Sequence, residues 1–285
     1  MKPPPFGYWA PERVDDALRL LAELGSDARV LAGGQSLVPI LNMRLASPAH
    51  LVDINGLTEL STVATGDDGV RVGALARQAA VERSGDVADV LPLLRQALRQ
   101  VAHPVIRNRG TVVGSIAHAD PSAELPAVLC LAGGEVTATS TAGSRTIPAG
   151  ELFVGPLETS LRPGELMTSA YFPALPAGTR TAFVEVARRH GDYAVCGVAV
   201  TVNLASDGVV TGARAAYVSM SDVPLVLDLT EALGGGRVTD GALEAAGRLA
   251  TTRMHPDGDI HASAAYRRHL AGVLTVRALR QAAPA

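Results

Sequence analysis

A stretch rich in proline and glycine, residues 173–180 (PALPAGTR), divides the sequence into two unlike parts. Proline and glycine interrupt regular helices and strands, so such a stretch is typical of a domain boundary. After it, apolar runs near residues 181–188, 195–204 and 209–219 predict an antiparallel meander, and helical patterns follow at about 225–233, 239–251 and 262–282. We therefore expect a C-terminal domain, residues 175–285, that combines an antiparallel sheet with helices.

The part before this boundary begins with a compact unit of helix and strand. Residues 12–24 place Val14, Leu18 and Leu21 on one face of a helix that ends at Gly25. Strands are expected at 29–32, 50–54, 61–65, 70–73, 135–140, 144–147 and 165–172, with helices at 87–102 and about 122–132.

These patterns predict an α+β fold with three units, residues 1–55, 56–174 and 175–285. A Rossmann fold is not expected, because no Gly-x-Gly-x-x-Gly follows the first strand and strands do not alternate regularly with helices.

Charge and cysteine usage narrow the function classes. The 285 residues carry a formal net charge of −3, without the basic footprint of a nucleic-acid-binding protein. The two cysteines, Cys130 and Cys196, both lie in apolar runs, and we expect two buried thiols in a reducing cytoplasm. Two cysteines are also too few to hold a cysteine-ligated iron–sulfur cluster. The sequence has neither a signal peptide nor a long apolar span, which predicts a cytoplasmic protein.

The first candidate binding turn is residues 32–37 (AGGQSL), where a predicted strand ends and a helix begins. Glycine lets backbone N–H groups approach an anion closely, and the start of a helix leaves further N–H groups unpaired. Ser36 offers a hydroxyl to the same anion or caps the helix. An ordinary Gly-Gly turn with a serine cap is the more common explanation of such a pattern, so this turn alone does not establish a site.

The second candidate turn is residues 109–124, in which small and hydroxyl-bearing residues are dense. Thr111 and Ser115 are candidates to bond phosphate oxygens, and Asp120 or Ser122 is expected to cap the next helix. Glu124 has two acceptor oxygens that suit the vicinal hydroxyls of a ribose, although an acidic residue in the first turn of a helix is commonly structural. Together the two turns predict a clamp around the diphosphate of a dinucleotide such as FAD.

Other catalytic patterns are weak. His118 and Asp120 lack a third metal ligand nearby, and we expect no metal site. No Walker lysine and no Gly-x-Ser-x-Gly elbow occur.

Four segments, in this order, resemble the FAD subunit of the xanthine dehydrogenase and carbon monoxide dehydrogenase family of molybdenum hydroxylases. They are residues 32–54 (AGGQSL, MRLASP and LVDI), 106–121 (IRNRGTVVGS and AHADP), 191–194 (GDYA) and 263–268 (SAAYRR). The resemblance spans nearly the whole chain. It implies a vanillyl-alcohol-oxidase-like, PCMH-type FAD-binding fold of two α/β subdomains followed by a C-terminal α/β domain.

The resemblance also implies the cofactor, its ligands and the partners. FAD is expected in this chain, with molybdopterin and [2Fe-2S] clusters in a large and a small partner subunit, as a dimer of heterotrimers. The chain would pass electrons to NAD, a quinone or another acceptor, with a possible association of the complex with the inner face of the membrane. The resemblance places Asp120 and Glu124 at the ribitol or adenosine side of FAD, Leu166 at the adenine and Tyr193 at the isoalloxazine ring. The full set of implied cofactor-binding residues is Ala32, Gly33, Gly34, Gln35, Ser36, Leu37, Thr111, Gly114, Ser115, Ala117, His118, Asp120, Glu124, Leu166 and Tyr193. No residue is expected to act as a catalytic acid or base.

One position departs from the family pattern. Val113 stands where the family usually has the first of two glycines, and valine disfavours a positive φ. This departure gives weight to one alternative, a nucleotide-binding regulatory or scaffolding module without redox activity. A stand-alone flavin oxidoreductase is the other alternative, and the short length argues against it, because no added substrate domain is evident. The substrate of the complex is not readable from this chain.

Overall fold

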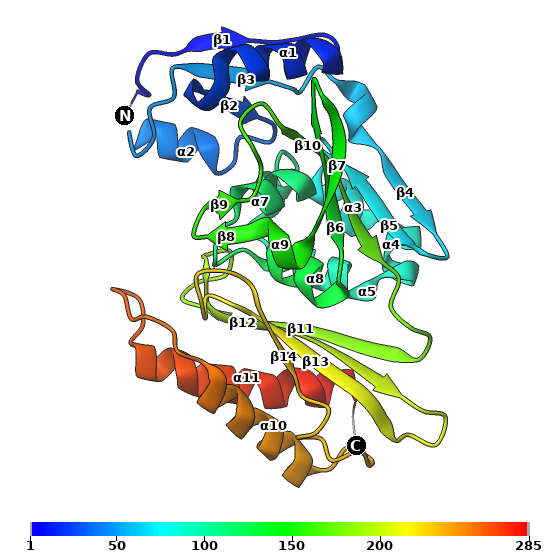
Figure 1. The fold of residues 1–285 in the computed structure, drawn as a ribbon. Helices are drawn as coiled ribbons and strands as arrows, with labels where there is room; N and C mark the ends of the chain where they lie inside the picture. Colours follow the sequence, from blue (N-terminus) through cyan, green and yellow to red (C-terminus); the bar gives the residue numbers. More distant parts are fainter. Residues whose placement is uncertain (1, 284–285) are drawn as a thin grey trace.

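Residues 2–283 are described by a computed structural model, in which three layers follow one another from the N-terminus to the C-terminus (Figure 1). The N-terminal layer is a parallel sheet in the order β1-β3-β2. Its elements are β1 (Gly7–Trp9), α1 (Val14–Leu24), the 3-10 helix η1 (Gly25–Asp27), β2 (Ala28–Leu31), α2 (Leu37–Asn42) and β3 (His50–Asp53). Ala17, Leu18 and Leu21 form the buried face of α1, as expected for an amphipathic helix.

The middle layer contains a five-stranded antiparallel sheet in the order β4-β5-β10-β6-β7. The sheet and the short segments beside it are η2 (Thr58–Ser61), β4 (Val63–Gly66), β5 (Gly69–Gly73), β6 (Glu135–Ser140), β7 (Gly143–Pro148), β8 (Phe153–Gly155), β9 (Glu158–Thr159) and β10 (Leu166–Pro173). Val70, Val72, Ala170 and Phe172 alternate along β5 and β10 and are completely or almost completely buried. This face of the sheet therefore belongs to the main core.

Seven helices of the middle layer cover that core, and most are short. They are α3 (Gln78–Arg83), α4 (Gly85–Val90), α5 (Pro92–Leu98), α6 (Pro104–Arg107), α7 (Val112–His118), α8 (Glu124–Ala132) and α9 (Ala149–Leu152). The almost wholly apolar α8 contacts α5 and α7 on one side and strands of the C-terminal layer on the other. A helix that is apolar all round is expected between two layers.

The C-terminal layer is an antiparallel sheet in the order β11-β12-β13-β14, with two helices on its outer face. Its elements are β11 (Thr179–Ala187), β12 (Ala194–Leu204), β13 (Val210–Val218), β14 (Leu225–Asp228), α10 (Asp240–Arg253) and α11 (Ala264–Ala282). The sheet buries both faces, because Phe183, Ala199 and Ala216 join the main core whereas Val198 and Val200 join a second core with α10 and α11. The fold class predicted from the sequence is confirmed.

The structure differs from the predicted elements at three places. The helix expected at 87–102 is two helices, because Leu91, which precedes Pro92, takes an extended φ of −139° and Pro92 starts a new helix. The helical pattern at 225–233 was misread: residues 225–228 form the edge strand β14, where pairing with β13 overrides the local pattern. The third difference is the short helix α6, in a segment where the sequence predicted no element.

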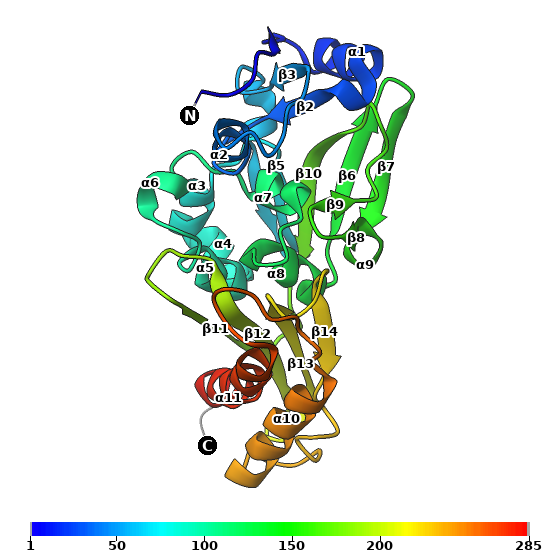
Figure 2. The ribbon, with the colours of Figure 1, turned by 90° about the vertical axis from the view of Figure 1, so that its left-hand side faces the viewer.

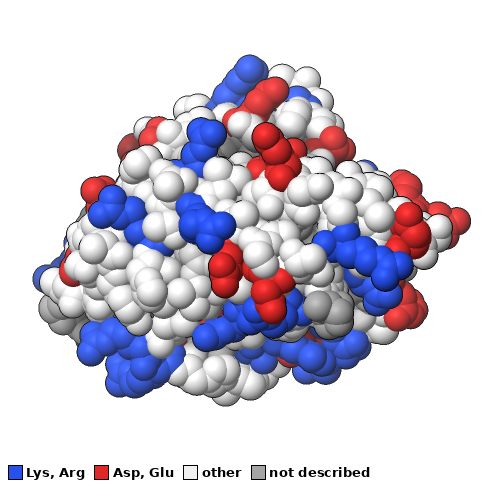
Figure 3. Space-filling view, turned by 90° about the horizontal axis from the view of Figure 1, so that it is seen from below, with Lys and Arg blue, Asp and Glu red and all other residues white. Residues whose placement is uncertain are grey.

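The face that carries α10 and α11 is mixed in charge (Figure 3), and the two cysteines form no disulfide bond. Viewed from below, arginine side chains lie among acidic ones and broad neutral areas on the face that carries α10 and α11 (Figure 3). Both cysteines are free; Cys196 is buried, Cys130 is only partly buried, and burial raises the pKa of each thiol to about 12. Among residues 2–283, none of the helices has the length and apolar character needed to cross a membrane.

Candidate functional site

The two glycine-bearing turns lie directly against each other. A Cβ atom on Gly33 would lie 2.5 Å from the carbonyl oxygen of Arg109, 2.8 Å from the Cα of Gly110 and 3.1 Å from the backbone nitrogen of Thr111. These separations are too short for any side chain, so only glycine allows this contact. The structure therefore brings together the two turns that the sequence predicted to meet.

The first turn carries unpaired backbone donors. Gly34 takes a φ of +71°, and the N–H groups of residues 33–37 donate to no other group among residues 2–283. The Gln35 side chain folds back and donates to the carbonyl of Gly33 at 3.1 Å. Ser36 precedes α2, but its side chain makes no capping hydrogen bond, contrary to one of its two expected roles. Successive free N–H groups form a concavity suited to an anion.

The second turn continues into α7, and its predicted site residues share one face of that helix. Gly114, Ser115, Ala117 and His118 are partly exposed, whereas Val112, Val113 and Ile116 are buried. Thr111 caps the helix, because its Oγ1 accepts a hydrogen bond from the Gly114 N–H at 3.0 Å, which leaves its O–H free to donate. Small side chains on this open face let a ligand approach the helix backbone.

Val113 fits its position without strain. It lies within α7, is 2% exposed and does not have a positive φ. Its side chain packs in the main core, on the side of the helix away from Gly114 and Ser115. The glycine geometry that the family pattern suggested is therefore not needed at residue 113.

Asp120 and Glu124 follow α7 and differ in accessibility. Asp120 accepts a hydrogen bond from the Ser122 N–H at 2.8 Å, and its Oδ2 lies 4.0 Å from Nε2 of His118. Neither Asp120 nor Ser122 caps α8, contrary to expectation, because Ala123 precedes the helix and makes no capping bond. Glu124 is only 7% exposed. The contact with ribose hydroxyls expected of Glu124 requires an accessible carboxylate, which the buried side chain does not offer.

Glu185 is a charged residue of this region that the sequence reading missed. It lies on β11, on the sheet face that packs against α5 and α8, and its buried Oε2 has no hydrogen-bond partner among the described residues. Burial raises the pKa of Glu185 to about 7; burial, together with the negative charge of Glu185, raises the pKa of Glu124 to about 8. Two carboxyl groups from different layers therefore favour the protonated form where the layers meet.

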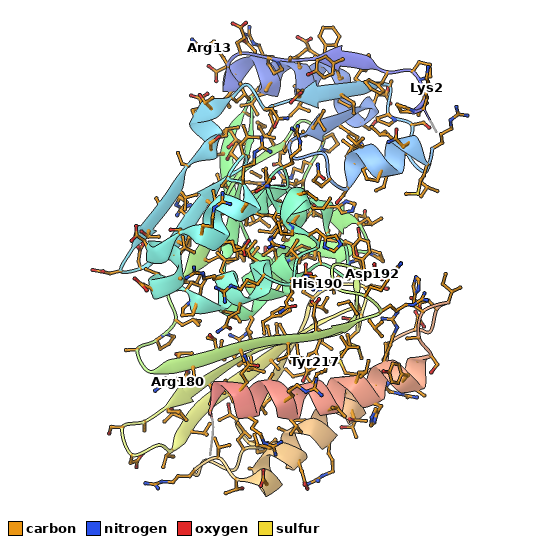
Figure 4. All side chains as sticks on the ribbon, turned by 180° about the vertical axis from the view of Figure 1, so that it is seen from behind. Lys2, Arg13, Arg180, His190, Asp192 and Tyr217 are labelled. Carbon is orange, nitrogen blue, oxygen red and sulfur yellow. The ribbon has the colours of Figure 1, made fainter. Side chains whose placement is uncertain are left out.

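The segment 191–194 (GDYA) places Tyr193 beside these acidic groups. Tyr193 is 66% exposed, and desolvation with the charges of Asp120 and Glu124 raises the pKa of its hydroxyl. Only glycine fits at residue 191 of this loop, because the φ there is +84° and a Cβ would lie 2.5 Å from the His103 ring. Figure 4 shows His190 and Asp192 where the middle layer meets the C-terminal sheet.

The predicted site residues therefore follow one side of the molecule. Figure 2, which faces that side, shows α2, α7 and α8 one below the other above the C-terminal sheet. Leu166 is the exception: it is 3% exposed, packs in the main core and lies two residues after Gly164, which approaches Ala22 of α1. A surface hollow of about 620 Å³ lies between residues 12–15 and 56–60 and contains none of the predicted site residues.

Comparison with known proteins agrees with this geometry. Residues 4–175 match the family model of the FAD binding domain in molybdopterin dehydrogenase, and residues 181–282 match that of the CO dehydrogenase flavoprotein C-terminal domain. Subunit alpha of the 6-hydroxypseudooxynicotine dehydrogenase complex of Paenarthrobacter nicotinovorans is 41% identical over 99% of this chain and 96% of its own length.

Solved structures give the same result. A chain of carbon monoxide dehydrogenase from Hydrogenophaga pseudoflava has a TM-score of 0.92 and 37% identity, and covers 99% of this chain and 98% of its own. A chain of quinoline 2-oxidoreductase from Pseudomonas putida 86 has a TM-score of 0.92 and 35% identity with the same coverage.

These matches confirm the predicted fold and the predicted cofactor. FAD is the cofactor of this chain, and the chain is a subunit of an oxidoreductase. In the homologous enzymes the molybdopterin and iron–sulfur centres lie in other subunits. The free N–H groups of the first turn and the open face of α7 fit a diphosphate. The chain belongs to the family of FAD-binding subunits of the xanthine dehydrogenase and carbon monoxide dehydrogenase group of molybdenum hydroxylases.

Proposed function

We propose that this chain transfers electrons from [2Fe-2S] clusters of a small partner subunit to an external acceptor, such as NAD or a quinone, in a complex whose large subunit holds molybdopterin. The observation that carries the proposal is the contact of Gly33 with the second turn, beside the unpaired N–H groups of residues 33–37. This arrangement suits the diphosphate of FAD and leaves the rest of the cofactor free to run along α7.

The roles of individual residues follow from their accessibility. The N–H groups of residues 33–37, together with Gly114 and Ser115 on the open face of α7, would bind the diphosphate. Thr111 was also expected to bind it, but this residue is only 2% exposed, so its role here is to cap α7. Ala117, His118 and Asp120 would line the path beyond it. Tyr193, whose ring is exposed at the junction of the layers, would contact the isoalloxazine ring. FAD, when bound, supplies the redox chemistry, and the chain's own residues bind and orient it and shape its surroundings.

We retain three broader proposals. The chain comprises functional units 1–55, 56–174 and 175–285; the complex is a dimer of heterotrimers; and it is cytoplasmic, with a possible association with the inner face of the membrane. The first is supported by the separate sheets of the three layers. The relatives are named for different substrates, and the substrate of this complex would be bound by the large partner subunit.

The test is purification of the complex through a tag on this chain, expressed together with its partner subunits. We expect two further subunits that carry iron and molybdenum, FAD released on denaturation, and a mass by light scattering of two heterotrimers. Substrate added without oxygen should bleach the flavin absorbance, and the physiological acceptor should restore it. A flavin that is never reduced through the partners would contradict the electron-transfer role.

The same experiment separates the alternatives. A chain that purifies alone and whose flavin is reduced directly by a substrate would be a stand-alone oxidoreductase. The regulatory or scaffolding alternative drew its support from Val113, and that support is absent from the structure, because Val113 occupies an ordinary helical position in the core.

A further inference from the structure

Two side chains outside the predicted site, Asn55 and Arg77, connect the first glycine turn to the second. Asn55 Nδ2 donates to the carbonyl oxygen of Ala32 at 2.8 Å. Arg77 Nη2 donates to Asn55 Oδ1 at 2.7 Å, and its Nη1 donates to the carbonyl oxygen of Arg109 at 2.5 Å. Three hydrogen bonds therefore form a continuous chain from residue 32, at the start of the first turn, to residue 109, at the start of the second.

A carboxylate fixes the orientation of Asn55. Both its backbone N–H and its Nδ2 donate to Asp53 Oδ1, at 2.9 Å and 2.6 Å, while the Tyr8 hydroxyl donates to Asp53 Oδ2 at 2.6 Å. Burial alone would raise the pKa of Asp53, but the hydrogen bonds from Tyr8 and Asn55 and the charge of Arg109 lower it below its ordinary value. The ionised Asp53 thus directs the amide oxygen of Asn55 toward Arg77.

The carbonyl group that Arg77 holds is the one against which Gly33 packs. A Cβ on Gly33 would lie 2.5 Å from this same oxygen of Arg109. The position of the Arg109 carbonyl therefore sets how closely the first turn approaches the second. The planar guanidinium group of Arg77 donates to this carbonyl and to Asn55 Oδ1 at the same time, and so fixes the position of the carbonyl.

Charge at this point also favours an anion. Arg77 is partly buried, and burial and the nearby positive charge of Arg109 lower its pKa, whereas Asp53 opposes this effect. Two guanidinium groups thus lie near one carboxylate, which leaves a net positive charge behind the turns. An excess positive charge here complements a diphosphate bound between them.

We propose that Arg77, oriented by Asn55, is a positioning residue that sets the spacing of the two glycine turns and thereby the affinity of the chain for the diphosphate of FAD. This inference rests on the FAD site proposed above. A lysine at position 77 keeps the charge but cannot reach both Asn55 Oδ1 and the Arg109 carbonyl with the geometry of the guanidinium fork. Removal of either partner therefore loosens the contact at Gly33.

The test uses the full complex, depleted of FAD, and titrations followed by flavin fluorescence and by competition. We expect Arg77→Lys and Arg77→Met to weaken binding of both FAD and ADP about tenfold or more, while binding of riboflavin, which lacks the diphosphate, stays within twofold. Asn55→Ala should weaken FAD binding similarly, and the double variant Asn55→Ala/Arg77→Met should be no weaker than the worse single variant. Arg71→Lys is the matched control. Arg71 is on β5, where its guanidinium lies over the ring of Tyr171, and its replacement should not change FAD affinity.

The outcomes are distinct. If the wild-type complex binds FAD and Arg77→Lys and Arg77→Met bind it within twofold of wild type, the positioning role is refuted while the FAD site stands. Equal losses of FAD and riboflavin binding in the Arg77 variants would indicate general destabilisation and also refute it. A wild-type complex that binds no FAD overturns both the proposed function and this inference.

Discussion

Replacement of Glu185 by glutamine should stabilise the chain at alkaline pH. In the fold, burial raises the pKa of Glu185 from its ordinary 4.5 to about 7. Its buried Oε2 has no hydrogen-bond partner among residues 2–283. The groups that share this junction are Glu124, Asp120 and Arg107, and the first two are acidic. A neutral amide of the same size removes the charge that the junction disfavours.

The direction of the pH dependence follows from proton binding. Between pH 4.5 and 7 the folded chain keeps the proton on Glu185, whereas the unfolded chain releases it, so unfolding releases a proton. The stability contributed by the protonated group is therefore complete below about pH 4.5 and is lost as pH rises through about 7. At about 1.4 kcal/mol for each pKa unit, the ionised carboxylate costs about 3 kcal/mol above pH 7. We reduce this to about 2 kcal/mol, because Glu185 is only partly buried and solvent screens part of the penalty.

Thermal unfolding, followed by circular dichroism at pH 5 and pH 8.5, measures this effect. For a chain of this size about 2 kcal/mol corresponds to roughly 4 °C, so Glu185→Gln should unfold about 4 °C higher than wild type at pH 8.5 and close to wild type at pH 5. Glu244→Gln is the matched control, because Glu244 is exposed on α10 beside Arg248 and should shift little at either pH. An equal shift at both pH values, or a less stable Glu185→Gln at pH 8.5, would refute the reasoning.

Three further substitutions test the site and the core. Gly33→Ala should reduce flavin content at least tenfold, measured as the flavin-to-protein absorbance ratio, because its Cβ meets a backbone carbonyl, whereas Gly241→Ala in open space on α10 should not. Val113→Gly should lower the free energy of unfolding in urea by about 2–3 kcal/mol without raising FAD affinity; tighter binding would show that the family's glycine matters. Tyr217→Phe should cost about 1 kcal/mol in the same assay, since it removes the buried hydrogen bond to Thr275, and an unchanged midpoint would contradict that role.

The sequence predicted the backbone of the site better than its side chains. The contact between the two turns depends on glycines at positions where no side chain fits. These glycines can be recognised within the short segments 32–37 and 109–115 themselves. Helix caps were predicted less well. Ser36 and Ser122 are suitable cap residues, yet neither side chain caps its helix, because the choice of cap depends on the direction from which the chain enters the helix.

The errors in secondary structure have one common cause. Residues 225–228 had a helical pattern on their own, but an unpaired edge of β13 was available, and a strand satisfies its backbone hydrogen bonds. The spacing of apolar residues shows which face of a segment is apolar. It contains no information about a strand, distant in the sequence, that pairs with the segment. Long-range pairing therefore decided this element, as it commonly does for short apolar segments.

Glu185 shows the same limit for charged residues. In residues 182–186 the apolar Ala182, Val184 and Val186 face the second core, so the alternation of a strand places Glu185 on the opposite face, which a sequence reading would assign to water. That face is instead covered by two helices of the middle layer, α5 against β11 and α8 against the neighbouring strands, and the N-terminal residue of α8 is the buried Glu124. Neither segment reveals the other in the sequence, although each is accurately read as a strand or a helix. The two carboxyl groups thus come near each other only when the layers assemble, and the charge of Glu185 then adds to burial in raising the pKa of Glu124.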